Sequence, residues 1–75
     1  MSRTVDELER RRVERLVPQI MDELQAYRSV THGTEHVKDV ELWRKAARIA
    51  GRRLGIQVRT GVSRDGRKVW ASEGP

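Results

Sequence analysis

The sequence contains no cysteine and no phenylalanine, and its 75 residues include only two tryptophans, one tyrosine and two prolines. Without cysteine the chain can form neither a disulfide bond nor a thiolate metal site. Its core must therefore consist mainly of aliphatic side chains. A chain of this length buries only about 60% of its unfolded surface and is marginally stable alone. We expect one small domain, residues 1–75, that gains buried area from a second copy of itself or another partner.

Long apolar segments are also missing. No run of about 18 apolar residues exists, so the sequence predicts no transmembrane helix. The N-terminal stretch MSRTVDELERRR lacks the apolar segment of a signal peptide. These absences predict a cytoplasmic protein with no membrane partner.

Positive charge is concentrated in the second half of the chain. The net charge is +5 at pH 7; residues 1–38 carry seven Lys/Arg and seven Asp/Glu, whereas residues 39–75 carry nine and four. This asymmetry predicts that the second half meets an anionic partner.

Residues 34–54 have the pattern of a basic amphipathic helix. At about 100° per residue, one stripe collects the apolar side chains: Val37, Val40, Trp43, Ala47, Ala50 and Leu54. Lys45, Arg48 and Arg52 fall on the opposite side. Leu42 and Ile49 form a narrow second seam, which predicts two apolar partners for this helix.

The ends of this helix have sequence markers. Thr34 or Asp39 is the expected cap, and Thr34 is preferred because the apolar phase already begins at Val37. Gly55 is the expected stop, since helices often end with glycine in the left-handed region. Four small residues predict close approach by another backbone: Ala46, Ala47, Ala50 and Gly51.

A β-hairpin is predicted over residues 56–72, because Asp65-Gly66 lies between two β-branched runs. A two-residue turn pairs Val62 with Val69 and Thr60 with Ala71; a four-residue turn from Ser63 to Gly66 shifts the partners but keeps the faces. The predicted core face holds Ile56, Val58, Thr60, Val62, Val69 and Ala71. The other holds Gln57, Arg59, Gly61, Lys68, Trp70 and Ser72.

A first helix is predicted over residues 4–28, with Thr4 and Glu7 forming a capping box. Pro18 interrupts it and costs about 3 kcal/mol in a helix interior. One kinked helix and two shorter helices both fit, and the unbroken apolar phase favours the kinked helix. Its stripe predicts a homodimer interface made of Val13, Leu16, Val17, Ile20, Leu24 and Tyr27.

Three shorter segments complete the chain. Arg10 to Arg12 are interpreted as a solvated helix face paired with Glu7, Glu9 and Glu14 rather than a phosphate-binding arm. Ser29 to Gly33 is predicted to be a linker, and residues 73–75 a disordered tail.

The stretch from His32 to His36 matches the metalloprotease pattern H-x-x-E-H. That chemistry needs both histidines on one helical turn and a third ligand. Gly33 lies inside the pattern, and the chain is too short for a substrate cleft, so we interpret the match as chance. We expect no metal, no cofactor and no catalytic residues.

The expected fold class is α+β: a long kinked N-terminal helix, a second basic helix and a C-terminal two-stranded β-hairpin. This helix–helix–hairpin order resembles a reduced winged helix in layout, which carries little information about function.

A basic helix beside a hairpin predicts a small nucleic-acid-binding protein, because nucleic-acid binders set cations against phosphates and insert a helix or ribbon into a groove. Duplex DNA is favoured over RNA, in a regulatory or architectural role of bacterial or phage type. An exposed indole can also stack on a base. The alternative is an adaptor or inhibitor that binds an acidic protein surface. The expected nucleic-acid contacts are Arg44, Lys45, Arg48, Arg52, Arg53, Arg59, Arg64, Arg67, Lys68 and Trp70.

Overall fold

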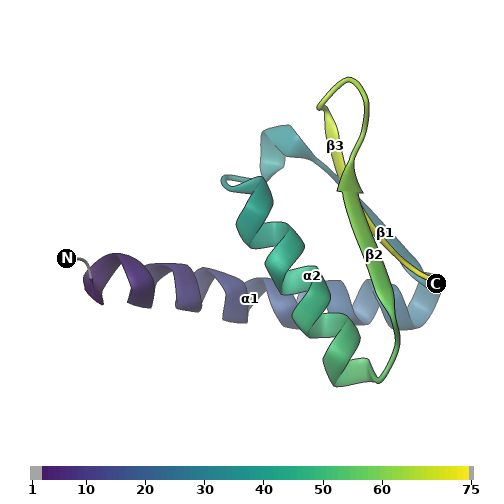
Figure 1. The fold of residues 1–75 in the computed structure, drawn as a ribbon, viewed down its shortest axis with the longest axis horizontal. Helices are drawn as coiled ribbons and strands as arrows, with labels where there is room; N and C mark the ends of the chain where they lie inside the picture. The colour runs from purple at the N-terminus through teal and green to yellow at the C-terminus, as the bar shows by residue number, and fades with distance from the viewer. Residues whose placement is uncertain (1–2, 75) are drawn as a thin grey trace.

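The computed structural model describes the backbone of residues 3–74 and the side chains of residues 7–74. Two helices and a three-stranded antiparallel sheet form an α+β fold, as the sequence predicts (Figure 1). The elements in chain order are α1 (Arg3–Tyr27), β1 (Ser29–Gly33), the 3-10 turn η1 (Thr34–His36), α2 (Val40–Leu54), β2 (Val58–Val62) and β3 (Lys68–Glu73).

Helix α1 runs through Pro18 as one element, which decides between the two expectations for this segment (Figure 1). It ends where Arg28 adopts a left-handed φ of 63° and donates its N–H to the Leu24 carbonyl at 2.9 Å. The expected capping box depends on the Thr4 side chain, which lies outside the described side chains.

The predicted linker from Ser29 to Gly33 is wrong, because this segment forms strand β1. It pairs antiparallel with β3, and Val30 faces Ala71 while His32 faces Val69. The sheet order is β1-β3-β2, so β1 adds a third strand beside β3 of the predicted two-stranded hairpin. A five-residue strand with one buried apolar side chain has too short a pattern to predict a partner from sequence.

Helix α2 begins at Val40, so the preferred start at Thr34 was wrong. The other candidate, Asp39, is the cap. The Asp39 carboxylate accepts the Leu42 N–H at 3.2 Å. Thr34 instead starts the turn η1, and its N–H donates to the Arg67 carbonyl at 2.8 Å. At the other end Gly55 adopts a left-handed φ of 73°, as predicted.

The hairpin has the predicted register: Val62 faces Val69, and Thr60 faces Ala71. This is the register expected of a two-residue turn, and not the shifted one. The tip is nonetheless wider than two residues: the Ser63 N–H donates to the Lys68 carbonyl at 2.8 Å, and the Gly66 N–H donates to the Ser63 carbonyl at 2.9 Å. The prediction of a disordered tail is wrong for two of its residues. Glu73 belongs to β3, and the Gly74 N–H donates to the Gln57 carbonyl at 3.1 Å; Pro75 lies outside the described residues.

The core lies between α1, α2 and the inner face of the sheet. Its largest fully buried side chains are Trp43, Ile20, Leu24, Val17 and Val69. Small residues let α2 approach closely, as predicted: a Cβ added at Gly51 would lie 2.4 Å from a methyl carbon of Val58.

The residues predicted to form a dimer interface are mostly part of this core. Val17, Ile20 and Leu24 are at most 1% exposed, Val13 is 6% exposed, and Leu16 is half-buried. Only Tyr27 is open to solvent, at 74% exposure. The chain itself therefore covers most of the predicted stripe, and Tyr27 and part of Leu16 are what remains open to a second copy.

Candidate nucleic-acid interface

The basic side chains of α2 lie on its solvent side, as the helical spacing predicts. Lys45, Arg48 and Arg52 are exposed, opposite the buried Ala46, Ala47 and Ala50. Their helix is anchored on both flanks, because α2 packs against α1 on one side and β2 and β3 on the other. A rigid core thus holds this row of cations in place.

Two of these cations meet a third from the sheet. Arg48, Arg52 and Arg59 line one shallow groove of about 630 Å³ at the β2 edge, together with Ile56, Gln57, Val58 and Gly74. We call it the β2-edge groove. No acidic side chain is among its lining residues, and neither Arg48 nor Arg52 forms an ion pair with any described side chain.

The outer face of the sheet continues this surface from Arg59. On this face Trp70 faces Gly61 across the strand pair and Thr31 on the other side. The Trp70 ring covers Gly61 so closely that an added Cβ there would lie 2.8 Å from a ring carbon. Trp70 is half-buried, and its ring can pack flat against the strand because residue 61 has no side chain.

The hairpin tip carries three more predicted residues, Arg64, Arg67 and Lys68, all exposed. Asp65 lies among them and organises the turn: its carboxylate accepts the Ser63 hydroxyl at 2.6 Å and the Arg67 N–H at 3.0 Å. The Ser63 hydrogen bond, followed by the Arg67 backbone, lowers the pKa of Asp65 below its usual value of 3.8. The tip lies at the other end of β2 from the β2-edge groove.

Three of the predicted contacts also meet other parts of the fold. Arg44 is held inside the fold, where it donates to the Thr60 carbonyl and to Glu41, each at 3.2 Å. Lys45 and Arg53 line a small groove between the helices together with Arg10, Glu9, Glu14, Val13, Val17 and Ile49. Sequence spacing put these cations on one helix but could not say which neighbour each one faces.

The second apolar seam of α2 is covered within the chain. Leu42 is 8% exposed, and Ile49 packs against the core. The protein-binding alternative would use these two side chains together with the basic face of α2; in the structure Leu42 is buried and Ile49 is half-buried.

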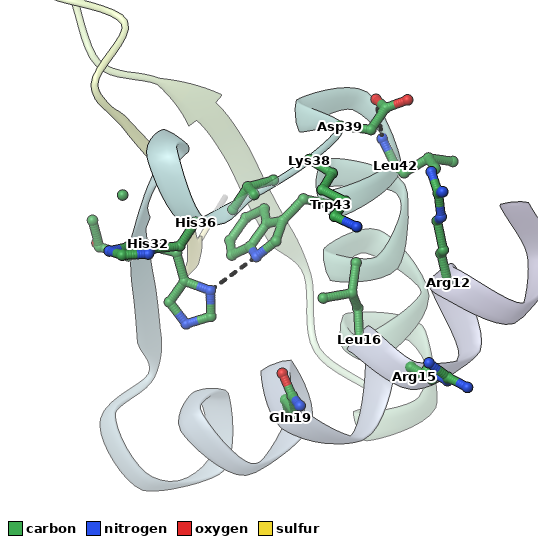
Figure 2. Close-up of a pocket in the computed structure, with 13 residues that line it drawn as sticks. Arg12, Arg15, Leu16, Gln19, His32, His36, Lys38, Asp39, Leu42 and Trp43 are labelled. Carbon is green, nitrogen blue, oxygen red and sulfur yellow. Dashed lines mark hydrogen bonds between the residues drawn. The ribbon is translucent and has the colours of Figure 1, made fainter.

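His32 takes part in a hydrogen-bonded chain that the H-x-x-E-H match did not suggest. The Trp43 indole N–H donates to His32 Nδ1 at 3.0 Å (Figure 2). On the other side of the ring, His32 Nε2 lies 2.9 Å from Glu23 Oε2. Since Nδ1 accepts, the neutral ring carries its proton on Nε2 and donates it to Glu23. His36 is exposed and lies beside Glu35. Among the described residues, no group of three or more His, Asp or Glu side chains is placed to hold a metal ion.

Sequence reasoning missed a second basic surface. A groove of about 690 Å³ lies between α1, β1 with η1, and the start of α2 (Figure 2). We call it the α1–η1 groove. Its lining residues are Arg12, Arg15, Leu16, Gln19, Thr31, His32, Gly33, His36, Val37, Lys38, Asp39, Leu42 and Trp43. The triplet of arginines was the available clue, and it was interpreted as paired with glutamates.

The predicted pairing of these three arginines with glutamates is wrong. None of Arg10, Arg11 and Arg12 lies within ion-pair distance of an acidic side chain among residues 7–74. Glu7, Glu9 and Glu14 remain exposed on the same helix.

Comparison of the chain with protein-family models, with curated proteins and with solved structures gives no match. Within the part of the chain that the structure describes, neither helix is both long and apolar enough to cross a bilayer.

Proposed function

We propose that this protein binds nucleic acid, with duplex DNA as the main ligand, through the solvent side of α2 and the β2-edge groove. In this role it acts by binding and not by catalysis, in a regulatory or architectural capacity in the cytoplasm. Neither sequence nor structural likeness contributes to this proposal, which is based on the geometry and charge of the surface.

The observation that carries the proposal is that Arg48, Arg52 and Arg59 converge on one groove whose lining residues include no acidic side chain. Like charges held together on a rigid scaffold repel one another, and a polyanion relieves that repulsion. Phosphate neutralisation by Lys and Arg supplies most of the affinity of non-specific DNA binding. Lys45 extends the row along α2 by one helical turn.

The shape of the surface favours duplex over single-stranded ligand. An α-helix fits the major groove of B-DNA, and α2 presents one fully exposed side. Strand β2 is at the sheet edge, so Arg59 reaches a backbone that passes alongside α2. Trp70 lies on the adjoining outer face, where its ring can stack on an exposed base.

The deciding experiment is a salt-titrated gel shift on a random duplex. Each neutralised phosphate contributes about 0.9 to the slope of log affinity against log salt. The double variant Arg48→Ala/Arg52→Ala should flatten that slope by roughly 2 and weaken binding to every sequence. The fold should be retained, because both side chains are exposed.

A matched control removes the same charge elsewhere. Arg10→Ala/Arg11→Ala takes two exposed arginines from α1, outside the β2-edge groove, and should keep most of the slope. Equal losses in the two double variants would replace the proposed interface with a diffuse charge effect. No binding to DNA or RNA even at roughly 50 mM salt would reject the proposal in favour of a protein partner.

Trp70→Ala tests the outer face separately. Stacking releases no counterions, so this variant should lower affinity with little change in slope. The loss should be larger on single-stranded than on duplex DNA, since stacking is worth about 1–3 kcal/mol per base on an unpaired strand. Unchanged affinity for both ligands would limit the interface to α2 and the groove.

A further inference from the structure

The α1–η1 groove combines an apolar floor with a cationic rim. The floor is formed by Leu16, Val37, Leu42 and Trp43, which all pack against or belong to the core. Figure 2 shows Arg12 and Arg15 on the α1 side, His36 on the η1 side and Lys38 between the helices above the floor. The groove is thus apolar at the base and positive at the edge.

The polar groups around this groove are mainly donors. The Trp43 N–H and His32 Nδ1 satisfy each other, so neither is left for a ligand. The one acidic side chain, Asp39, already accepts the Leu42 N–H as the cap of α2. Arg12, Arg15 and Lys38 make no ion pair with any described side chain. Three cations therefore face one carboxylate that is already engaged, and the groove has an excess of positive charge.

We propose that the α1–η1 groove binds a small amphipathic carboxylate, an aromatic or aliphatic acid. Its apolar body lies on the floor over Leu16 and Val37, and its carboxylate meets Arg15 and Lys38. A volume of about 690 Å³ is in the range of small-molecule sites.

This site goes beyond the proposed nucleic-acid function and does not depend on it. Its rim residues come from α1 and the segment before α2, whereas the β2-edge groove uses Arg48, Arg52 and Arg59. Variants at one site leave the other intact, so each proposal can fail without the other.

The two tryptophans provide the measurement. The Trp43 indole belongs to the floor of the α1–η1 groove, and Trp70 lies on the opposite face of the sheet. Titration with 2-naphthoate, followed by the indole N–H peaks in proton–nitrogen NMR spectra, should move the Trp43 peak saturably and leave the Trp70 peak in place. The spectrum of Trp70→Phe assigns the two peaks.

Two further probes separate charge from apolar contact. The amide of the same ring, 2-naphthamide, keeps the body and loses the charge; acetate keeps the charge and loses the body. The amide should bind about five-fold more weakly, as expected for losing one charged contact at an exposed site. Acetate should give no saturable shift. If the amide binds as tightly as 2-naphthoate, the cationic rim has no role and the proposal is wrong.

Matched variants locate the site. Arg15→Gln and Lys38→Gln should each weaken 2-naphthoate binding by about three- to five-fold. Arg11→Gln removes the same charge from an exposed position on α1 that does not line the groove, and should leave the affinity within about two-fold. Equal losses for Arg11→Gln and Arg15→Gln would overturn the proposal, as would movement of the Trp70 peak alone or no shift at millimolar 2-naphthoate.

Discussion

The two faces of the sheet use a tryptophan in different ways. On the inner face, Trp43 is 0% exposed and its N–H is bonded to His32 of β1. On the outer face, Trp70 is half-buried against Gly61, and its N–H has no hydrogen-bond acceptor among the described residues. The same residue type is therefore a fully satisfied core element on one face and an available contact on the other. Burial and hydrogen-bond satisfaction, and not residue type, decide whether a side chain stays available to a ligand.

The largest loss of stability is expected when a charge is placed in the core on the inner face of the sheet. Ile20→Glu puts a carboxylate at a position that is 0% exposed, among apolar core side chains. An unpaired buried charge costs more than about 4 kcal/mol, which is most of the stability of a small domain. We expect loss of the helical circular-dichroism signal at 25 °C.

The same variant also tests the predicted dimer. If α1 forms a dimer seam through Ile20, the variant would be a folded monomer and only sedimentation would change. A folded Ile20→Glu protein with the wild-type melting temperature would contradict the burial of this side chain in the monomer.

Replacing each tryptophan with phenylalanine sharpens the comparison. Trp43→Phe removes the donor to His32 and leaves a gap in the core, at a cost of about 2 kcal/mol. Trp70→Phe should cost less than about 0.5 kcal/mol, because that ring is partly in solvent. Urea denaturation of both variants gives the difference directly. Equal losses would show that the outer ring is as important to stability as the inner one.

A smaller effect is expected where α2 meets β2. Gly51→Ala adds a methyl group that would lie 2.4 Å from Val58, so the strand must shift. Overpacking costs roughly 1–3 kcal/mol, while alanine gains about 1 kcal/mol in helix propensity over glycine. The net result is a loss of about 1 kcal/mol in the urea-derived stability. Arg52→Ala, one residue along on the exposed side, is the control and should be near neutral; a more stable Gly51→Ala protein would show that the two elements are not in close contact.

The smallest effect concerns the hairpin tip and depends on pH. The folded-state pKa of Asp65 lies below its unfolded value of 3.8, so its contribution to stability is fully present above that pH and is lost as pH falls through the folded pKa. We expect the carboxyl carbon of Asp65 to titrate below 3.8 in NMR spectra and Ser63→Ala to raise that pKa. Titration at 3.8 in both proteins would contradict the hydrogen bond that the Ser63 hydroxyl donates to the Asp65 carboxylate.

Several features followed from local spacing alone. The stop at Gly55, the solvent side of α2 and the pairing of Val62 with Val69 depend on residues close in sequence. Helical and strand periods report which side chains share a face, and turn residues set the register of a hairpin. The continuity of α1 through Pro18 was favoured for the same reason, since its apolar phase is unbroken.

Tertiary structure decided what covers each face. Strand β1 has no pattern of its own and exists because β3 offers it a free edge, with the Glu73 N–H donating to the Arg28 carbonyl at 2.9 Å. Because Thr34 follows β1 directly and starts η1, it does not cap α2, and Asp39 takes that role. Most of the stripe of α1 packs in the core of its own chain, where Ile20 and Leu24 are 0% exposed.

The candidate sites divide in the same way. Helical spacing placed Arg48 and Arg52 together, but only the position of the β2 edge added Arg59 to them and turned Arg44 inward to the Thr60 carbonyl. The α1–η1 groove joins Arg12 to Lys38 across 26 positions of sequence, through the return of the chain along β1. Periodicity specifies the direction of a side chain relative to its own element. Which distant element it meets depends on how the elements pack.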